Sequence, residues 1–514
     1  MRKGTILKRT GNKAVKGLIL ILVFFAVSCV PELDPYSFAP PSKEYEWNPE
    51  DKPEKYFPEK SDLAELSEDL APYRENLVLT QLIDEALQNS PDTEKAWAEA
   101  RAAAAAWAVA RGEYYPSVDG IAEAKKSKFD ASSGLISFEQ TTAELALSLD
   151  YLLLDFGGRR AEIEEAKQTL ISANWTQNKA IQDVVFNVTS AYYNLIGNKS
   201  IVEADLENLE EAQTSLDAAN LRLEVGLGTV PDVLQAQSSL AQAELDLVND
   251  RGQVEISRGN LATAVGWGAN EVYEVEEVDE DFEPALLSEN VDNLIEIAMQ
   301  SRPDLAATLA LVRQSEASIK SARSAMLPSL STSGTLSQLY VWSGDGFFEG
   351  DAEANTNYQF GLTLAVPIFH GFALRNAVKE AEADLEAARA TLKIQEQEVI
   401  SDVWDGYYNF QTSVQALAAA KKLLASSLES YNASLERYRS GVGDIIELLN
   451  AQTTLATSRS EMVQARTDVF ISYAELINAV GVNLPVSAGG ETVEVPEFKF
   501  KNSNDQEENN ENAE

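Results

Sequence analysis

Apolar residues recur at steps of three and four along two long stretches of the chain. The first stretch comprises Ile181, Val185, Val188, Tyr192, Leu195, Val202, Leu206, Leu209, Leu216 and Leu223. The second comprises Ile400, Val403, Tyr407, Phe410, Val414, Leu417, Leu424, Leu428, Tyr431, Leu435 and Tyr438. This spacing is a heptad pattern and predicts coiled-coil helices. Each helix should begin near Gly157-Gly158 or Gly371 and end at Gly226 or Gly441, which makes it roughly 100 Å long.

A period of two replaces the heptads in two shorter stretches. Leu145, Leu147, Leu149 and Tyr151 alternate with Glu144, Ala146, Ser148 and Asp150, and Tyr358, Phe360, Leu362, Leu364 and Val366 alternate with small or polar residues. Such alternation predicts two-faced β-strands. More polar partner strands are expected after Pro116 and Pro328. The sequence therefore predicts four strands in two hairpins, each strand about 10 residues long, with polar loops near 127–139 and 339–356.

Glycine clusters interrupt the heptads at two places. Val225-Gly226-Leu227-Gly228-Thr229 ends the first long helix, and Ser440-Gly441-Val442-Gly443-Asp444 ends the second. Glycine supplies the backbone conformations that a tight turn between helices requires. Heptad spacing resumes after each cluster, so a returning helix is predicted. Each long helix and its returning helix should form a coiled-coil hairpin.

The same features occur twice because the chain is a tandem duplication. Tyr192-Tyr193-Asn194 and Ala236-Gln237 recur as Tyr407-Tyr408-Asn409 and Ala451-Gln452, at a constant offset in the numbering (407 minus 192, and 451 minus 236). Upstream the offset is smaller by three, as in Pro91-Asp92 and Pro303-Asp304. This difference predicts loops of different length in the two halves. A repeat this long is a large supersecondary unit, and a symmetric assembly is its natural product.

The apolar face of the predicted strands has two possible partners. Strands that are apolar on one face and polar on the other suit a transmembrane β-barrel that several chains close together. Alternatively, two small surface hairpins pack on the helices. The barrel is favoured because an isolated hairpin is only marginally stable.

Composition narrows the class of protein further. The chain has 514 residues, 45% of them hydrophobic, and a net charge of -41. This charge opposes binding to nucleic acid. One Cys and one His leave no room for a disulfide framework or a Cys/His metal cluster, so no metal and no cofactor are expected. His370 lacks a recognisable catalytic partner and is expected at the end of a strand, where Asp155 is its repeat equivalent.

The N-terminus has the pattern of an export signal. Six Lys or Arg residues precede the apolar run 17–27, which ends at Ala26-Val27-Ser28-Cys29. This resembles a bacterial lipobox, although Ala26 departs from the usual Leu. The resemblance implies that Cys29 is lipidated. It also implies that Val30, in place of Asp after the Cys, favours sorting to the outer membrane over retention in the inner membrane. An ordinary signal peptide with an incidental Cys is the alternative.

Together, the duplication, the strand pairs, the heptads and the Val-Gly-Leu tip resemble the TolC-like outer-membrane efflux proteins, in their lipoprotein subclass. The resemblance implies a mostly α-helical fold with a membrane β-barrel. The resemblance further implies that three chains form a 12-stranded barrel and a periplasmic α-helical cylinder. The expected segments are a signal peptide (1–28), a lipid-anchored extended leader (29–77), the first repeat (78–266), an acidic linker (267–289), the second repeat (290–481) and an acidic disordered tail (482–514).

The resemblance also implies roles for the two tips. Val225, Gly226, Leu227 and Gly228 match the motif that contacts a periplasmic adaptor, and Ser440, Gly441 and Val442 form its degenerate copy. The alternative is that these glycines only turn the chain. Beyond the second tip, Glu447 retains the first of two acids that narrow the pore of the family's type member, whereas Asn450 replaces the second. Asp444, Tyr438 and Arg437 complete the expected pore constriction, and the last two are candidates to hold a closed state.

The predicted function is that of a passive exit duct. The resemblance implies a homotrimer in outer-membrane lipid that receives substrates from an inner-membrane pump through the adaptor and performs no enzymatic chemistry. The other function considered is a non-conducting coiled-coil lipoprotein with a structural role in the envelope. That function accounts for the heptads and for Cys29, but not for duplicated two-faced strands beside duplicated glycine tips.

Overall fold

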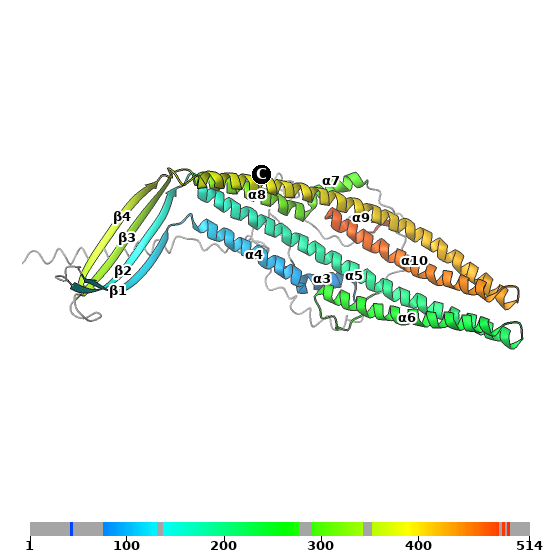
Figure 1. Ribbon diagram of the computed structural model, residues 1–514. Coiled ribbons are helices and arrows are strands. Elements are labelled where there is room, and N and C mark those ends of the chain that lie inside the picture. The colour runs from blue at the N-terminus through cyan, green and yellow to red at the C-terminus, as the bar shows by residue number, and fades with distance from the viewer. Residues whose placement is uncertain are drawn as a thin grey trace, which may run out of the picture.

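The chain forms an elongated molecule with a β-sheet at one end and two helical tips at the other (Figure 1). The computed structural model describes residues 42–44, 76–130, 137–276, 290–342, 352–482, 486–488 and 491–493. Cys29 and the predicted signal peptide lie outside these residues. Among the described residues, no helix combines the length and the apolarity that crossing a membrane requires.

The helices of the two repeats match in length. In the first repeat they are α3 (Leu79–Asn89), α4 (Pro91–Gly112), α5 (Gly158–Glu224) and α6 (Val230–Val265). In the second they are α7 (Val291–Ser301), α8 (Pro303–Ser324), α9 (Ala373–Arg439) and α10 (Ile445–Val480). Both members of each pair have the same length, namely 11, 22, 67 and 36 residues. The predicted long and returning helices are therefore confirmed.

Four strands form one antiparallel sheet in the order β1-β2-β3-β4. They are β1 (Ser117–Asp130), β2 (Ser137–Leu154), β3 (Ser329–Trp342) and β4 (Glu353–Ala365). The predicted strand length is wrong, because the strands are longer, with 14, 18, 14 and 13 residues. Both hairpins consequently extend into the stretches 127–139 and 339–356 that were expected to be loops. In β1 and β2, Glu139 pairs with Lys126 at 3.1 Å and with Lys128 at 3.7 Å across the strands.

The register places apolar residues of neighbouring strands on one face of the sheet. Leu147 of β2 lies opposite Leu336 of β3, which lies opposite Tyr358 of β4. On the other face Ser148, Thr335 and Gln359 are opposite one another. Tyr358 is 86% exposed, so no residue that the structure describes covers the apolar face at β4. The predicted two-faced strands are confirmed.

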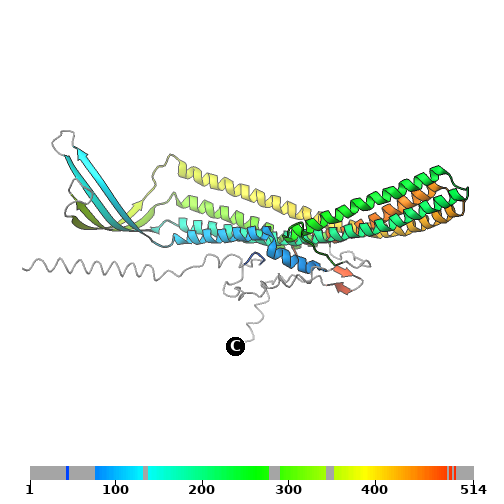
Figure 2. The ribbon, with the colours of Figure 1, turned by 90° about the horizontal axis from the view of Figure 1, so that it is seen from below.

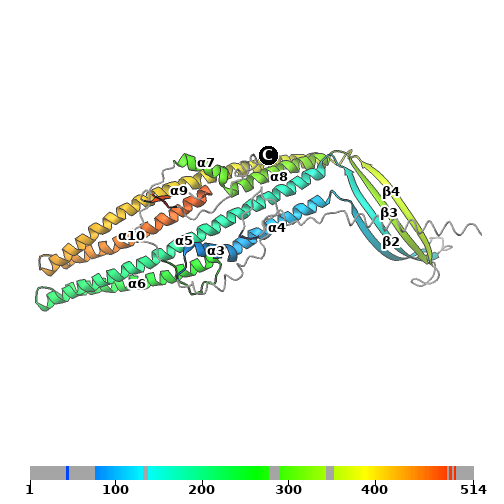
Figure 3. The same ribbon diagram turned by 180° about the vertical axis from the view of Figure 1, so that it is seen from behind.

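The two longest helices run the whole length of the helical body. On the side of the sheet, α5 packs between α4 and α8, and on the side of the tips it packs between α6 and α10 (Figures 1 and 3). Helix α9 packs against α8 and then against α10 in the same manner. Viewed from below, the helices form a layer rather than a ball (Figure 2).

The buried core is divided along the length of this layer. One cluster of buried residues joins α3, α5 and α6 within the first repeat, and a second joins α7, α9 and α10 within the second repeat. A third cluster lies near the tips and combines Ala219, Ala236, Tyr438 and Leu448 from both repeats. Not every heptad position is buried, since Leu206 is 45% exposed. The two repeats therefore share one core near the tips and have separate cores elsewhere.

A further pair of short strands lies beyond the second repeat. They are β5 (Val486–Ala488) and β6 (Glu491–Val493), which pair antiparallel. The expected total of four strands therefore holds for the main sheet only. Both short strands fall within the segment that was predicted to be a disordered tail.

Candidate functional site

The two tips have the same backbone hydrogen bonds. In the first tip the amides of Leu227 and Gly228 both donate to the Arg222 carbonyl, at 2.8 and 2.9 Å. In the second tip the amides of Val442 and Gly443 both donate to the Arg437 carbonyl, at 3.0 and 2.9 Å. These bonds satisfy carbonyl groups at the helix ends, as in a Schellman-type cap. The duplication therefore extends to the geometry of the turns.

Each turn uses its two glycines for different reasons. Gly226 and Gly441 have φ angles of 77° and 84°, in the left-handed region that favours glycine. Their surroundings are open, because an added Cβ would meet no atom within 4 Å. A Cβ on Gly228 would instead lie 3.0 Å from the backbone nitrogen of Leu223. The first glycine of each turn therefore sets the backbone conformation, and the second allows the chain to approach the helix end.

Apolar side chains project from both tips into solvent. Val225 is 60% exposed, Leu227 69% and Val442 72%. The returning helices begin directly beside them, with the Asp232 carboxylate capping the Thr229 amide at 2.9 Å and the Asp444 carboxylate capping the Glu447 amide at 2.8 Å. These caps fix the positions at which the exposed residues are presented.

Arg222 connects the two tips. Its guanidinium donates to the backbone carbonyl groups of Tyr438 at 2.9 Å and Gly443 at 3.1 Å, both in the second tip. It also donates to the Leu227 carbonyl of its own tip at 3.3 Å. The guanidinium carbon lies 4.4 Å from the centre of the Tyr438 ring, in a cation-π arrangement. One arginine therefore holds both turns and an aromatic ring of the neighbouring hairpin.

Tyr438 is a buried member of this contact. Its side chain is 1% exposed, and its hydroxyl has no hydrogen-bond partner among the described residues. Burial raises the pKa of the hydroxyl, the positive charge of Arg222 opposes this, and Asp232 adds to the increase. Because the net pKa is raised, the phenol is neutral near neutral pH. Arg222 therefore binds an uncharged ring and the Tyr438 carbonyl, not the hydroxyl.

The other predicted constriction residues lie around the second tip. Arg437 contacts both carboxylate oxygens of Glu447, at 3.1 and 3.4 Å. Asp444, at the start of α10, and Asn450, within its first two turns, are both exposed. The structure thus brings Arg437, Glu447 and Asp444 together within one hairpin. Sequence reasoning missed Arg222, although it is the repeat equivalent of Arg437 and an alignment of the two repeats identifies it.

A second arginine joins the hairpins farther from the tips. Arg459 of α10 contacts both carboxylate oxygens of Glu211 of α5 at 2.8 Å, and its side chain is 11% exposed. It also donates to Asn208 at 2.7 Å and pairs with Glu207 at 3.0 Å. A two-point contact between a guanidinium and a carboxylate is geometrically specific. This arginine therefore fixes the register of α10 against α5.

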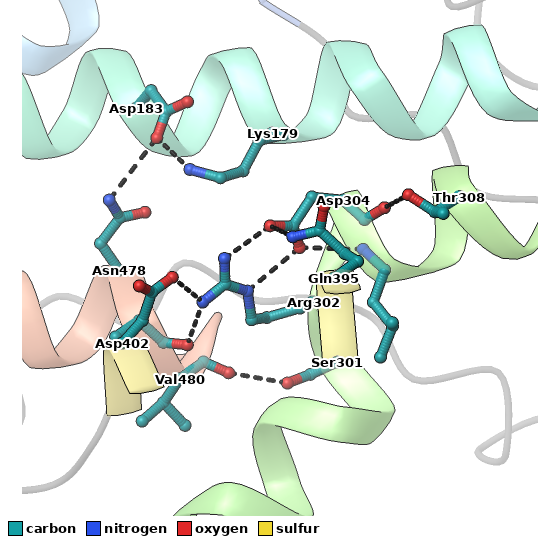
Figure 4. A network of polar contacts seen from close by, with 12 residues as sticks. Lys179, Asp183, Ser301, Arg302, Asp304, Thr308, Gln395, Asp402, Asn478 and Val480 are labelled. Carbon is teal, nitrogen blue, oxygen red and sulfur yellow. Dashed lines mark hydrogen bonds and ion pairs between the residues drawn. The ribbon is translucent and has the colours of Figure 1, made fainter. Parts of the chain in front are cut away.

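A third arginine holds the base of the second hairpin, as Figure 4 shows. Arg302, 7% exposed, binds the Asp304 carboxylate at 2.5 and 3.0 Å and Asp402 of α9 at 2.8 Å. It also donates to the Ala479 carbonyl of α10 at 3.2 Å. Burial would raise the pKa of Asp304, but the hydrogen bonds and charge of Arg302 outweigh burial and lower it below 3.8. In the first repeat, Ser90 occupies the position of Arg302.

His370 lies in the connection between β4 and α9, so its predicted position at a strand end is only approximate. Its carbonyl accepts from the Ala373 amide at 3.0 Å at the start of α9. His370 and Asp155 line one cleft of about 360 Å³ between the sheet and the helices. The Asp155 carboxylate caps the Arg159 amide at 2.6 Å. Within the described residues, no group of three or more His, Cys, Asp or Glu side chains has the arrangement of a metal site.

A duplicated unit of strands and helical hairpins is also what the family comparison finds. The family model for "Outer membrane efflux protein" matches residues 82–267 and 294–482, one match in each repeat. The chain belongs to the outer membrane efflux protein family. The predicted resemblance and fold class are therefore confirmed.

Relatives and solved structures agree with this assignment. The chain is 26% identical over 408 residues to protein CyaE of Bordetella pertussis, covering 79% of this chain and 84% of that protein. It is 24% identical over 420 residues to outer membrane protein TolC of Escherichia coli, covering 78% and 82%. The fold is similar to the OprN outer-membrane channel (TM-score 0.69, 21% identity, covering 78% and 89%). It is also similar to outer membrane protein VceC of Vibrio cholerae (TM-score 0.68, 22% identity, covering 80% and 97%).

Membership of this family gives the chain its place in the cell. It is an outer-membrane channel component of a tripartite efflux system, and it extends from the outer membrane into the periplasm. The sheet is the end that lies in the membrane, and the two helical hairpins are the periplasmic end. The tips described above are therefore the part of the molecule farthest from the outer membrane.

Proposed function

We propose that three copies of the chain form a closed passive duct, through which substrates delivered by an inner-membrane pump and a periplasmic adaptor leave the cell. The observation that carries this proposal is the sheet, which has two unpaired edges, β1 and β4, and an exposed apolar face. An open sheet of this kind calls for strand partners and an apolar environment. Three copies of four strands give a 12-stranded barrel, and lipid covers its outer face.

The same assembly accounts for the helical layer. Its edges are α6 and α9 near the tips, so the layer of one copy has free edges for the next copy. Three layers joined at these edges close a cylinder that continues the barrel. The duct carries out no enzymatic chemistry. A lipid on Cys29, the first residue that remains when the signal peptide 1–28 is removed, anchors the leader. The mass of the mature N-terminal peptide tests this.

The first experiment is conduction by the purified trimer. The full chain inserted into planar lipid bilayers is expected to give stable ionic currents, because a barrel continuous with a hollow cylinder leaves a water-filled path. Current recordings on the trimer, compared with bilayers that receive detergent alone, measure this. A trimer that inserts but stays silent would favour a non-conducting structural lipoprotein.

The exposed tips support contact with the adaptor. The first tip presents the apolar side chains of Val225 and Leu227 on a capped turn that Gly226 and Gly228 form. The second tip presents Val442 on the matching turn with Ser440 and Gly441. A group of aliphatic side chains exposed to solvent is typical of a surface that binds another protein. We assign these residues to adaptor docking.

Glu447 supports a constriction near the second tip, together with Asp444, Asn450, Tyr438 and Arg437. Three Glu447 side chains near one axis would favour cations. The pairing of each with Arg437 offsets part of this charge. The constriction is therefore a ring of ion pairs, in which carboxylate and guanidinium have opposite effects on selectivity.

Because the two side chains have opposite effects, the direction in which each variant changes the cation preference of the pore can be predicted. Glu447→Gln is expected to reduce the preference for cations, because it removes a negative charge from the pore wall. Arg437→Ala is expected to increase this preference, because it leaves the carboxylate unpaired. Reversal potentials in a salt gradient across the bilayer measure both. If neither variant changes the reversal potential, these side chains do not line the conducting path.

A further inference from the structure

Two carboxyl groups face each other between α5 and α6 of the first hairpin. Asp205 of α5 is 6% exposed, and the Asp250 carboxyl of α6 lies within hydrogen-bonding reach of it. Both lie about 20 residues from the tip, which corresponds to roughly 30 Å along a helix. The pair is thus built into the helix-to-helix contact of the hairpin, away from the tip residues.

The hydrogen bonds of Asp205 are incomplete. Its Oδ1 accepts from the Asn208 amide at 3.5 Å, whereas its buried Oδ2 has no donor among the described residues. Two ionised carboxylates offer only acceptors to each other. A buried acceptor without a donor is costly, and a proton on either carboxyl group supplies the missing donor. The geometry therefore calls for one proton in this contact.

The charged groups around the pair do not supply the missing hydrogen-bond donor. On α6, Asp246 adds a further negative charge. On α10, Arg459 is occupied by Glu211 and Glu207, and it reaches Asp205 only through Asn208. Arg466 of α10 donates to Ser200, which precedes Asp205 by more than one helical turn. The positive charges of the neighbouring helix are thus engaged with other groups.

Burial and the neighbouring Asp250 raise the pKa of Asp205 from 3.8 to about 7. Because the folded-state pKa is raised, the folded hairpin binds the proton more tightly than an opened one does. The stabilisation by the proton is fully present below pH 3.8 and is lost as the pH rises to about 7. The hairpin therefore loses this stabilisation between mildly acidic and neutral pH.

The second repeat contains no such pair. At the offset that relates the two hairpins, Asp205 corresponds to Ala420 and Asp250 to Ala465. Both alanines are 8% exposed and belong to the core cluster of α9 and α10. The same helix-to-helix contact therefore contains two carboxyl groups in one hairpin and two methyl groups in the other. The duplicated hairpins differ in their response to protons at this position.

We propose that Asp205 and Asp250 share one proton that closes the first hairpin, and that loss of this proton loosens α6 from α5. The second hairpin stays closed over the same range of pH. Two adjacent ionised carboxylates repel each other in this buried contact. The first hairpin thus becomes the mobile one as the pH rises. Asn208, which donates to Asp205, is in turn bound by Arg459 of the second hairpin.

Hydrogen exchange of the full-length trimer tests this proposal without any pump or adaptor. Protection of α6 amides around Asp250, corrected for intrinsic exchange, is expected to fall about tenfold between pH 6 and pH 8. Amides around Ala465 of α10 serve as the internal reference and should keep their protection. In Asp205→Asn the amide supplies a donor without titrating, so the dependence on pH should vanish.

The controls separate this effect from general instability. Asp468→Asn alters an exposed carboxylate of α10 and should leave the tenfold change intact. The double variant Asp205→Ala, Asp250→Ala reproduces the alanine pair of the second repeat and should be independent of pH. A wild-type trimer with constant protection of α6 would overturn the proposal. A tenfold change that persists in both Asp205 variants would overturn it as well.

Discussion

Replacing Gly226 by tryptophan is expected to abolish efflux-dependent resistance while the trimer still forms. Gly226 has a positive φ angle, so a side chain there costs roughly 1–2 kcal/mol of backbone strain. No atom lies within 4 Å of an added Cβ, so the new side chain projects outward from the turn without a clash. It would then occupy the surface between Val225 and Leu227 that we assign to the adaptor.

Drug susceptibility of cells that express the variant, together with the trimer yield in membranes, measures this effect. Gly226→Ala is the matched control, since it has the same backbone strain without the bulk and should retain most of the resistance. Gly441→Trp places the same side chain on the second tip and reports whether both tips contribute. If Gly226→Trp assembles and still confers full resistance, the first tip is not where the adaptor binds.

Replacing Arg302 by alanine is expected to destabilise the folded chain by about 3–5 kcal/mol. Among the residues that the structure describes, the change leaves the half-buried Asp304 carboxylate with the Gln395 side chain and the Leu305 amide as its hydrogen-bond donors. It also removes the link from α8 to Asp402 of α9 and to the end of α10. Removing one partner from a buried ion pair is costly because the remaining charge stays uncompensated.

Denaturant or thermal unfolding of the purified protein measures this loss. Arg323→Ala, on the helix α8 that Arg302 precedes, is the control, because Arg323 pairs with Glu382 at 2.8 Å and both side chains are exposed. That exposed pair should contribute less than about 1 kcal/mol. Since Arg302 lowers the pKa of Asp304, the ion pair stabilises the wild type above about pH 4 and less at lower pH. Equal shifts in the two variants would show that the Arg302 contacts add little.

The helices were predictable because their signals are local. Heptads and the glycines at the helix ends determine α5, α9 and the returning helices to within a few residues. The strands were predicted too short because the run Lys125-Lys126-Ser127-Lys128 has the composition of a loop. In the sheet this run remains extended, since it pairs along β2, and Lys126 and Lys128 pair with Glu139. The alternation of apolar and polar residues that predicts a strand is absent wherever both faces of the sheet accept polar side chains.

The contacts that tie the repeats together were not predictable from local patterns. Arg222 of the first repeat meets Tyr438 of the second, and Glu211 of the first meets Arg459 of the second, so the partners lie far apart in the chain. Nor does a single sequence show which glycine and alanine residues lie where two helices cross. An added Cβ on Gly197 of α5 would lie 2.4 Å from the Thr467 hydroxyl of α10, so this crossing requires glycine. Such contacts depend on which faces meet, which heptads alone do not specify.

The equal helix lengths of the two repeats have a consequence for how this molecule can change in size. Both long helices have 67 residues and both returning helices have 36, so the two tips end at the same level. Removing one heptad from α5 and α6 alone would leave the first tip about 10 Å behind the second. Arg222 would then have no carbonyl groups of the other tip to bind. The distance that the molecule extends from the sheet to the tips is therefore set jointly by four helices. It can change only if α5, α6, α9 and α10 gain or lose the same number of residues.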